Sequence, residues 1–521
     1  MNTRWWKAVA VVAAGLVLTA ASCTDTTVEP KSSITGANVF NDENSYTSFI
    51  ARVYSGLAVS GQQGAAGNPD IQGIDEGFSQ YLRLYWETEE LPTDEAVIGW
   101  GDIGLPEMNT QMWSSSSNMV VAMYYRIYFQ VGMANQFLRE TTDEMLASRG
   151  VTGQLLSDIK QYRAEARFLR ALSYWHGIDM FGDMPLVKET DPLGATPPKQ
   201  ATRTEIYNYI VSELQAIKND LPAGGPSTYG RANKAAASML LAKVYLNAGV
   251  YAGTPQYAQA LTAIQDVIGS GFTLDPNYRH LFMADNNTSP EIIFPVPFDG
   301  NHTQTWGGMT FLIHAACGGS MNPGDYGIDG CWWGTRLKPQ AYALFGAGDK
   351  RASYFWTAGQ SVQVGKIDDW GQGIAAPKFT NKTSTGANGS NASFPDTDFP
   401  MFRLGDAYLM YAEAVVRGGG GSRGQALTYV NALRQRAGVT AWSDADLTLD
   451  NILAERVREL LWEGQRRTDL VRFGKFSSGT YLWAWKGGSQ AGAALPAGRD
   501  VFPIPFNEMV ANPNLTQNPG Y

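Results

Sequence analysis

Cysteine and histidine are scarce: the 521 residues include only three cysteines and four histidines. The histidines have no HExxH spacing and no Cys-rich cluster accompanies them, so a zinc site is not expected. We expect no strand followed by GxGxxG, no GxxxxGK[ST] loop, and no GxSxG on a strand-turn-helix. These absences argue against zinc, nucleotide-dependent and serine-nucleophile enzymes. Carboxylates are plentiful, so a paired-carboxylate glycosidase stays open, although no pair is singled out.

Positive charge and long apolar runs are also in short supply. The net charge of −9 argues against nucleic-acid binding, because phosphate backbones recruit a basic surface. The one long apolar run, "AVAVVAAGLVLTAA" at 8–21, follows a basic start and is too short for a comfortable membrane span. Because "AAS" then precedes Cys23, this N-terminus resembles a bacterial lipobox, in which the peptide is cut before an acylated cysteine. An ordinary signal peptide with an incidental cysteine is the alternative.

The export signal at the N-terminus leads to predictions for other segments. We predict a signal peptide at 1–22 and a Thr- and Ser-rich flexible tether at 23–43. The other two cysteines, Cys317 and Cys331, form an even pair in an exported chain, which predicts a disulfide. It would close a loop of about 15 residues and stabilise the fold by about 3 kcal/mol. Two unpaired thiols are the alternative.

Helical patterns dominate both halves of the chain, which predicts a mainly α fold. Residues 231–249 with 255–271, and 403–419 with 422–438, have the pattern of tetratricopeptide-type helix pairs. Between the pairs, residues 272–400 are rich in Gly, Asn, Pro and aromatics, with a strand candidate at 291–298. Long irregular regions of this kind are usually functional. Further helices are predicted at 44–58, 118–139, 158–181 and 204–221, and a second loop-like region at 60–117.

The most charged stretch is "ERVRELLWEGQRRTDLVRFGKF" at 455–476. If 452–467 is one helix, Glu455, Glu459 and Glu463 share a stripe and Gly464 lies among apolar residues, where a second helix can approach. The stripe could be a carboxylate cluster for metal or acid–base chemistry. However, Arg456 and the arginines after Glu463 lie in or beside it and would keep the glutamates ionised. We therefore predict a structural ion network.

The chain has 15 tryptophans, many of them in loop-like sequence. A sugar ring offers C–H faces to aromatic planes and hydroxyl rims to amides and carboxylates, so exposed Trp or Tyr beside Asn, Asp or Arg predicts a glycan site. A core or loop-anchoring role is the alternative for each Trp. The predicted disulfide would brace the last of these loops and lower the ordering cost of binding. The candidate contacts are Trp100, Asp102, Asn301, Trp306, Tyr326, Trp332, Trp333 and Arg336.

Five ordered motifs together resemble the SusD/RagB family of outer-membrane nutrient-binding lipoproteins. They are "QYRAEARFLRALSYWHGIDMFGDMPLV" (161–187), "GRANKAAASMLLAKVYLNAG" (230–249), "FPMFRLGDAYLMYAEAVVR" (399–417), the charged stretch 455–476, and "VFPIPFNEMVANPNLTQNPGY" (501–521). The resemblance implies a SusD-like fold: mainly α, with tetratricopeptide-like helix pairs and a loop-rich, ligand-binding region with short strands. It places one such domain at 44–521, with a helical scaffold at 44–271 and 401–476, loops at 272–400 and a closing segment at 477–521.

The same resemblance implies a function. Family members bind oligosaccharides at the surface of Bacteroidota-type cells and deliver them to a SusC-like TonB-dependent transporter; they are not enzymes and bind no nucleic acid. It also implies an outer-membrane lipid anchor at Cys23, palmitate included. We expect no cofactor, although the Asp- and Asn-rich loops are compatible with a structural Ca²⁺. A structural adaptor, a peptide or host-glycan binder of the same family, and a surface hydrolase are the alternatives.

Overall fold

The computed structural model describes residues 40, 42–194 and 196–521. The predicted signal peptide, Cys23 and nearly all of the predicted tether lie outside these residues. From Thr47 to Tyr521 the chain forms one compact unit; before it, the rings of Phe40 and Tyr46 lie 5.0 Å apart. Within the described residues, no helix combines the length and apolarity needed to cross a bilayer.

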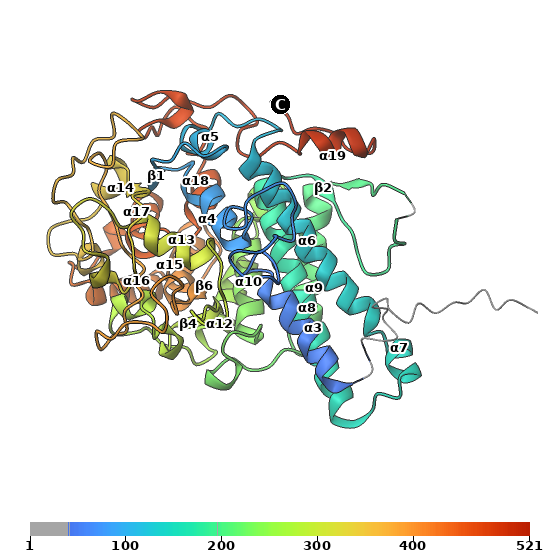
Figure 1. The fold of residues 1–521 in the computed structure, drawn as a ribbon. Helices are drawn as coiled ribbons and strands as arrows, with labels where there is room; N and C mark the ends of the chain where they lie inside the picture. Colours follow the sequence, from blue (N-terminus) through green and yellow to red (C-terminus); the bar gives the residue numbers. More distant parts are fainter. Residues whose placement is uncertain (1–39, 41, 195) are drawn as a thin grey trace, which may run out of the picture. The chain divides into compact units, whose positions relative to one another are not determined.

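Helices make up most of the regular structure (Figure 1). The helices of the first half are α3 (Glu43–Ser55), α4 (Tyr81–Glu90), α5 (Leu105–Thr110), α6 (Asn118–Glu140), α7 (Asp143–Ser148), α8 (Gly153–Met180), α9 (Arg203–Ile217), α10 (Lys234–Leu246), α11 (Ala248–Tyr251) and α12 (Tyr257–Ile268). Those of the second half are α13 (Gly308–Ala315), α14 (Pro339–Tyr342), α15 (Leu404–Val416), α16 (Arg423–Ala437), α17 (Leu449–Leu460), α18 (Arg466–Arg472) and α19 (Phe506–Ala511).

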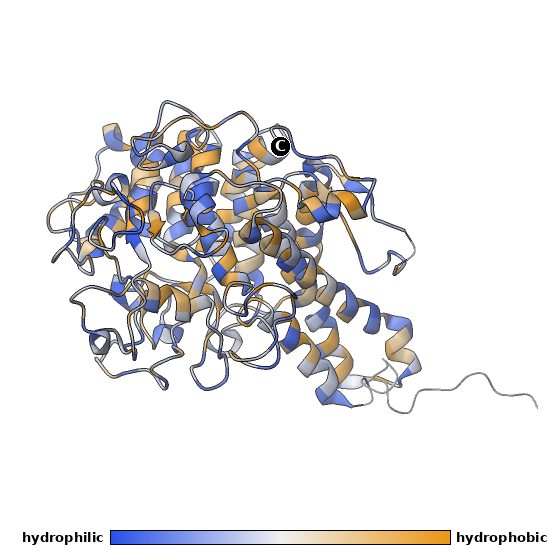
Figure 2. Ribbon diagram, turned by 45° about the horizontal axis from the view of Figure 1, so that its top comes forward, coloured by the Kyte–Doolittle hydropathy of each residue, from blue (hydrophilic) through white to orange (hydrophobic). Residues whose placement is uncertain are grey.

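The predicted helix pairs are present. Helix α10 packs on α12, α15 packs on α16, and α12 contacts α15, so the two pairs adjoin. Local signals set the helix ends: the Asn233 side chain accepts the Ala236 N–H at the start of α10, and α16 ends at Gly438, whose φ of 74° suits glycine. Figure 2 shows that the helices of the molecule carry both hydrophobic and hydrophilic residues.

Three short antiparallel sheets tie distant segments together. Strand β1 (Ala96–Ile98) pairs with β5 (Thr335–Leu337), β2 (Met184–Pro185) with β3 (Gln200–Ala201), and β4 (Ile292–Val296) with β6 (Phe399–Arg403). Two of these pairings join the loop-rich region to other parts of the chain.

Two buried helices were not expected. Helix α4 lies in the predicted loop region 60–117, and α13 lies in the loop-rich region 272–400. Every residue of both helices is buried. Helix α13 is apolar almost all round and lacks an amphipathic period, whereas the ten residues of α4 include charged side chains whose burial its sequence does not indicate.

The predicted helix 452–467 is wrong, because the chain breaks between α17 and α18. Trp462 and Gly464 have φ values of 60° and 70°. The Gly464 N–H donates to Glu90 Oε1 at 2.6 Å and its carbonyl accepts the Tyr85 hydroxyl at 2.6 Å, so contacts with α4 replace helical hydrogen bonds. A Cβ on Gly464 would lie 2.3 Å from the Tyr85 ring, which explains the glycine.

The structural ion network is confirmed, although its partners differ from those predicted. Glu459 is fully buried and pairs with Arg403 at 2.8 Å, with Arg351 at 3.2 Å and with Arg436. Glu463 does not face Arg466 on one helix; it pairs with Arg403 at 2.7 Å instead. The pairs Glu455–Arg351, Glu455–Arg434, Glu463–Lys378 and Glu291–Arg403 extend this cluster. A second buried cluster joins Asp406–Arg456, Asp469–Arg456, Asp469–Arg472 and Glu413–Arg472, and Asp94–Arg466 is a separate buried pair.

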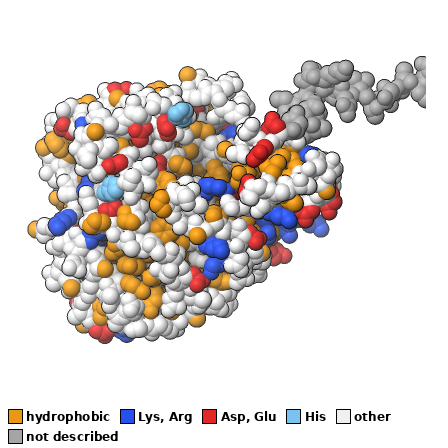
Figure 3. Space-filling model, turned by 90° about the horizontal axis from the view of Figure 1, so that it is seen from below, with side chains coloured by type: hydrophobic (Ala, Val, Ile, Leu, Met, Phe, Trp, Pro, Cys, Tyr) orange, Lys and Arg blue, Asp and Glu red, His pale blue; other side chains and the backbone are white. Residues whose placement is uncertain are grey.

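Charged side chains on one face of the molecular surface are not gathered into clusters like those of the interior. On the face drawn in Figure 3, basic and acidic side chains are interspersed, and hydrophobic side chains gather in a broad area. That face therefore lacks the continuous basic stripe that tracks a phosphate backbone.

The ion network leads to a stability prediction. Replacing Glu459 by Gln removes a carboxylate from three buried guanidinium groups, which should lower the free energy of unfolding by about 3 kcal/mol or more. Denaturant unfolding at pH 7 measures this loss. The control is Lys218→Gln, which breaks the partly exposed pair with Asp266 and should cost less than about 1 kcal/mol. Equal losses in both variants would contradict the prediction.

The same carboxylate predicts a pH dependence. Burial alone would raise the pKa of Glu459, but Arg436, Arg403 and Arg351 lower it to about 2. In the unfolded chain a Glu titrates at about 4.3. Because the folded pKa is the lower one, Glu459 stabilises the fold above about pH 4.3 and this contribution is lost as pH falls towards 2. The difference in unfolding free energy between wild type and Glu459→Gln should therefore shrink between pH 5 and pH 2.5; a constant difference would contradict it.

Candidate functional site

The pairing of β1 with β5 builds the centre of the candidate site. Ile98 lies opposite Thr335, so the residues after β1 run beside those before β5, and the Gly99 N–H donates to the Gly334 carbonyl at 3.1 Å. This register brings Trp100 next to Trp332, 232 positions further along the chain. The Trp100 indole N–H donates to the Trp332 carbonyl at 3.1 Å.

Three of the predicted tryptophans lie together. The ring centroid of Trp332 is 6.3 Å from that of Trp100 and 6.2 Å from that of Trp306, with interplanar angles of 49° and 51°. Trp306 is 41% exposed, and the other two are partly buried. We call these three residues the tryptophan arc.

Trp332, in the middle of the arc, is held from below by a histidine. Its ring stacks on His314 of α13, with centroids 4.7 Å apart and planes 27° apart. The His314 ring nitrogens lie 2.7 Å from the Gly330 carbonyl and 3.2 Å from the Ser393 carbonyl. Burial lowers the pKa of His314 below its usual range, although the two carbonyls act in the opposite direction.

Trp100 and Trp306, at the two ends of the arc, each lie close to a glycine. A Cβ on Gly334 would lie 2.7 Å from the Trp100 ring, and a Cβ on Gly77 would lie 2.9 Å from Trp306. The Trp306 backbone N–H also donates to the buried Glu76 carboxylate at 2.9 Å. The Trp100 ring is therefore held by close approach to Gly334, and the backbone of Trp306 is held by Gly77 and by a charge-assisted hydrogen bond.

The two cysteines lie next to the arc. The structure joins Cys317 and Cys331 in a disulfide with Cα atoms 4.7 Å apart, one residue before Trp332. The Trp332 N–H donates to the His314 carbonyl and the Trp333 N–H to the Cys317 carbonyl, both at 2.9 Å. The disulfide loop is thus held against the end of α13.

The other predicted contacts are spread more widely. Trp333 is 51% exposed and its ring lies 6.1 Å from Trp370, outside the arc. Asp102 and Asn301 are exposed on the loops that follow Trp100 and precede Trp306. Tyr326 lines a separate hollow of about 310 Å³.

Arg336 is not placed to contact a ligand. It is fully buried, and its guanidinium donates to backbone carbonyls of Gln372 at 2.7 Å and Gly334 at 3.2 Å, and also to that of Ile367. These bonds hold the 367–372 loop against β5. We therefore leave Arg336 out of the proposed contact set.

Several neighbours of the arc were not predicted. The Phe394 ring lies 5.0 Å from that of Trp306 and extends the aromatic surface. Arg83 of α4 lies 5.8 Å from the Trp100 ring centroid and 3.7 Å from that of Phe78. Phe394 is the first aromatic residue after the polar stretch 383–393, which is the sequence signal that could have identified it.

Trp100 also borders a hollow of about 370 Å³ with Gly99, Gly101, Pro106 and Ile367. The segment Gly99 to Gly104 spells GxGxxG between β1 and α5, so our expectation that no such turn follows a strand is wrong. It does not form a dinucleotide site of the usual kind: β1 runs antiparallel to its only partner strand, and α5 has six residues.

The charged stretch 455–476 is not a carboxylate cluster open to a substrate, because Glu455, Glu459 and Glu463 are all buried. The carboxylates of the charged stretch are buried in ion pairs away from solvent, and the pKa of Glu459, at about 2, does not suit a general acid. Among the described residues, no three His, Cys, Asp or Glu side chains gather as metal ligands. The arrangement of the arc is suited to binding: aromatic planes at different angles, next to exposed amide and carboxylate groups.

The chain matches known proteins over most of its length. Residues 351–521 match the model of the SusD family, and residues 85–246 match a model described as "Starch-binding associating with outer membrane". Starch-binding protein SusD of Bacteroides thetaiotaomicron is 35% identical over 90% of this chain and 91% of its own length.

Solved structures agree on the fold. A SusD superfamily protein of Parabacteroides distasonis has a TM-score of 0.71 at 23% identity and covers 94% of this chain and 100% of its own. Surface glycan-binding protein A of B. thetaiotaomicron, solved with laminarihexaose, has a TM-score of 0.70 at 21% identity and covers 91% and 99%. The mainly α fold is therefore confirmed, and the chain belongs to the SusD family.

Proposed function

We propose that this protein is a non-catalytic, cell-surface glycan-binding protein whose ligand stacks on the tryptophan arc. The observation behind the proposal is the arc itself: Trp100, Trp306 and Trp332 meet in one place although they come from distant segments. The planes of Trp100 and Trp306 are inclined to that of Trp332 by 49° and 51°, which suits a curved oligosaccharide better than a flat one. Asp102 and Asn301 are exposed nearby in sequence and are the first candidates for hydroxyl contacts.

The relatives suggest which glycans to test first. The 35% identical relative is named a starch-binding protein, and a fold neighbour was solved with laminarihexaose. We therefore propose a starch-type oligosaccharide as the first ligand and laminarihexaose as the second.

Delivery to a transporter is a further part of the proposal. One matching family model is described as associating with the outer membrane, and the lipobox-like start supplies a lipid anchor at Cys23. We infer that the anchored protein passes its glycan to a SusC-like TonB-dependent transporter. Binding by stacking and a few hydrogen bonds gives the moderate affinity that such a transfer needs.

Two other functions make different predictions. A structural adaptor would stay with the transporter but bind no glycan, and a family member specific for peptides or host glycans would bind only those. A surface hydrolase would release reducing sugar from a polysaccharide. The relatives named above are binding proteins, which favours binding over hydrolysis.

Substitutions in the arc test the binding site. Trp332→Ala and Trp306→Ala should each weaken maltoheptaose binding about tenfold or more, because each removes a stacking plane worth about 1.4 kcal/mol. Trp100→Ala should also weaken binding. Isothermal titration calorimetry with maltoheptaose and laminarihexaose measures these losses.

Phe506→Ala is the matched control, since Phe506 is 56% exposed on α19 and belongs to no part of the arc. It should leave binding unchanged. If a glycan binds all three Trp variants as tightly as wild type, the arc is not the site. If no glycan in a broad panel binds wild type, the adaptor is favoured.

Anchoring and partnership are tested in cells. Cys23→Ala should release the protein from the outer-membrane fraction and abolish incorporation of labelled palmitate, because the acylated sulfur is removed. Affinity purification of the wild-type protein should recover a TonB-dependent transporter. Membrane retention of Cys23→Ala would contradict lipid anchoring, and recovery of the protein without any transporter would contradict the delivery proposal.

A further inference from the structure

A second cavity lies apart from the tryptophan arc. Its volume is about 610 Å³, within the usual range for small-molecule pockets. Three separate segments form it: residues 224–233 before α10, residues 270–272 after α12, and residues 287–293 leading into β4. None of its lining residues belongs to the arc or to the hollow beside Trp100.

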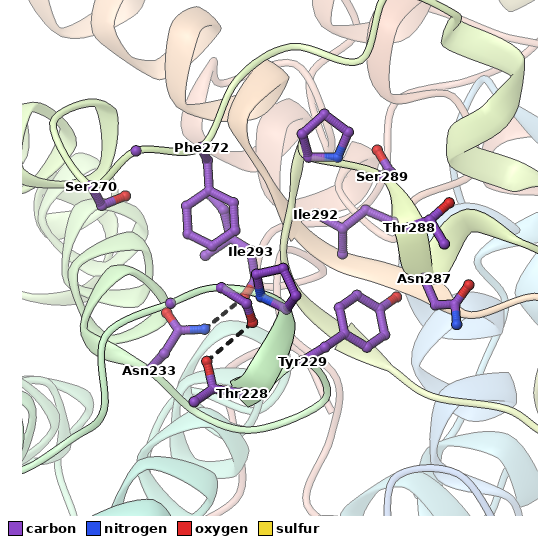
Figure 4. A pocket seen from close by; sticks show the side chains of 15 residues that line it. Thr228, Tyr229, Asn233, Ser270, Phe272, Asn287, Thr288, Ser289, Ile292 and Ile293 are labelled. Atoms are coloured by element: carbon purple, nitrogen blue, oxygen red, sulfur yellow. Dashed lines mark hydrogen bonds between the residues drawn. The ribbon is translucent and has the colours of Figure 1, made fainter.

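Two aromatic rings and two prolines give the cavity its apolar walls. Phe272 and Tyr229 lie on opposite sides, with Ile292 and Ile293 between them (Figure 4). Phe272 can close against the chain because Gly224 has no side chain: a Cβ there would lie 2.7 Å from the ring.

The Tyr229 wall is fixed from behind. The Tyr229 hydroxyl donates to Asp398 Oδ2 at 2.6 Å, and Asp398 Oδ1 accepts the Phe298 N–H at 2.7 Å. Asp398 is buried, and its carboxylate faces Tyr229 and Phe298, not the cavity. The ring orientation is therefore set before any ligand arrives, which lowers the ordering cost of binding.

The polar groups of the cavity are hydroxyls and amides. Thr228 and Thr288 each donate their hydroxyl proton to a backbone carbonyl, at 2.9 and 2.8 Å, so each keeps a lone pair that can accept. The Ser289 hydroxyl donates to Asp275 and accepts the Glu291 N–H, which fixes it at the wall. Asn287 is exposed at the rim, next to Thr288 (Figure 4). A ligand with several hydroxyl donors matches these acceptors.

No lining residue is charged. An anionic or cationic ligand would lose hydration there without gaining a counter-charge, which is costly. A purely apolar ligand would leave the hydroxyl lone pairs of the lining without partners. A sugar avoids both costs, since its C–H faces can lie on Phe272 and Tyr229 while its hydroxyls face the threonines and serines.

The geometry points to this cavity as a second binding site for a neutral saccharide of one or two rings. It goes beyond the proposed function, which needs only the arc. Because Asp398 joins Tyr229 to Phe298, the site is also linked to the loop that leads to Trp306.

The experiment uses a Trp306→Ala/Trp332→Ala protein, in which the arc is disabled. Saturation-transfer NMR with glucose, maltose and laminaribiose should still detect binding of at least one sugar. Adding Phe272→Ala should reduce the signal at least fivefold, whereas Phe272→Tyr, which keeps the ring, should preserve it. Asn287→Ala, at an exposed position, should reduce it as well and provides a second test if Phe272→Ala does not fold.

Three results would overturn the assignment: no transfer from any of these sugars in the arc-disabled protein, equal transfer with Phe272→Ala and Asn287→Ala, or binding of benzyl alcohol without any sugar. The two sites are distinguished by the variants. If the arc is not a binding site, the Trp variants bind maltoheptaose as wild type does, and this result does not depend on the Phe272 variants.

Discussion

The buried pairing of Arg403 with Glu459 and Glu463 is the interaction on which the rest of the structure depends. Arg403 is the last residue of β6, whereas Glu459 lies in the last turn of α17 and Glu463 lies in the break that follows it. A single guanidinium therefore fixes the helical scaffold to the strand that borders the loop-rich region. Burying these charges is costly, and the cost is offset because all three guanidinium nitrogens of Arg403 donate to carboxylate or carbonyl oxygens. This requirement accounts for the density of charge in the stretch 455–476, which has no direct contact with the proposed ligand site.

The break between α17 and α18 shows the limit of helical periodicity. The residues before and after the break keep a plausible helical pattern, so the sequence favours one helix over 452–467. What interrupts it is α4, whose Glu90 and Tyr85 bind the backbone of Gly464. These contacts join residues more than 370 positions apart and leave no local signal. The ion network itself was predictable, because so many arginines near glutamates can only be buried as pairs; the choice of Arg403 as partner was not.

For the candidate site too, the sequence indicated some residues but not how they are arranged. Composition identified Trp100, Trp306 and Trp332 as residues in polar, aromatic loops, which are typical of sugar contacts. It could not show that they meet, since β1 and β5 have three residues each and their pairing depends on tertiary packing. The same limit explains Arg336: a cation in an aromatic loop is a reasonable ligand contact until its guanidinium is found on backbone carbonyls. His314 was dismissed as a metal ligand, and its role as a support for Trp332 is visible only once the rings are placed.

The three tryptophans of the arc are held in place by neighbouring groups. The arc rings rest on fixed groups, with His314 under Trp332, Gly334 beside Trp100, and Glu76 bound to the backbone of Trp306. A ligand then meets planes that are already oriented, so little of the stacking energy is spent on ordering loops. Because the arc offers neutral aromatic faces, the binding proposed for it would depend on ring contacts and a few hydrogen bonds, not on buried charge. A surface that holds a sugar in this way can release it without breaking an ion pair, and this is the property that a protein handing its ligand to a transporter requires.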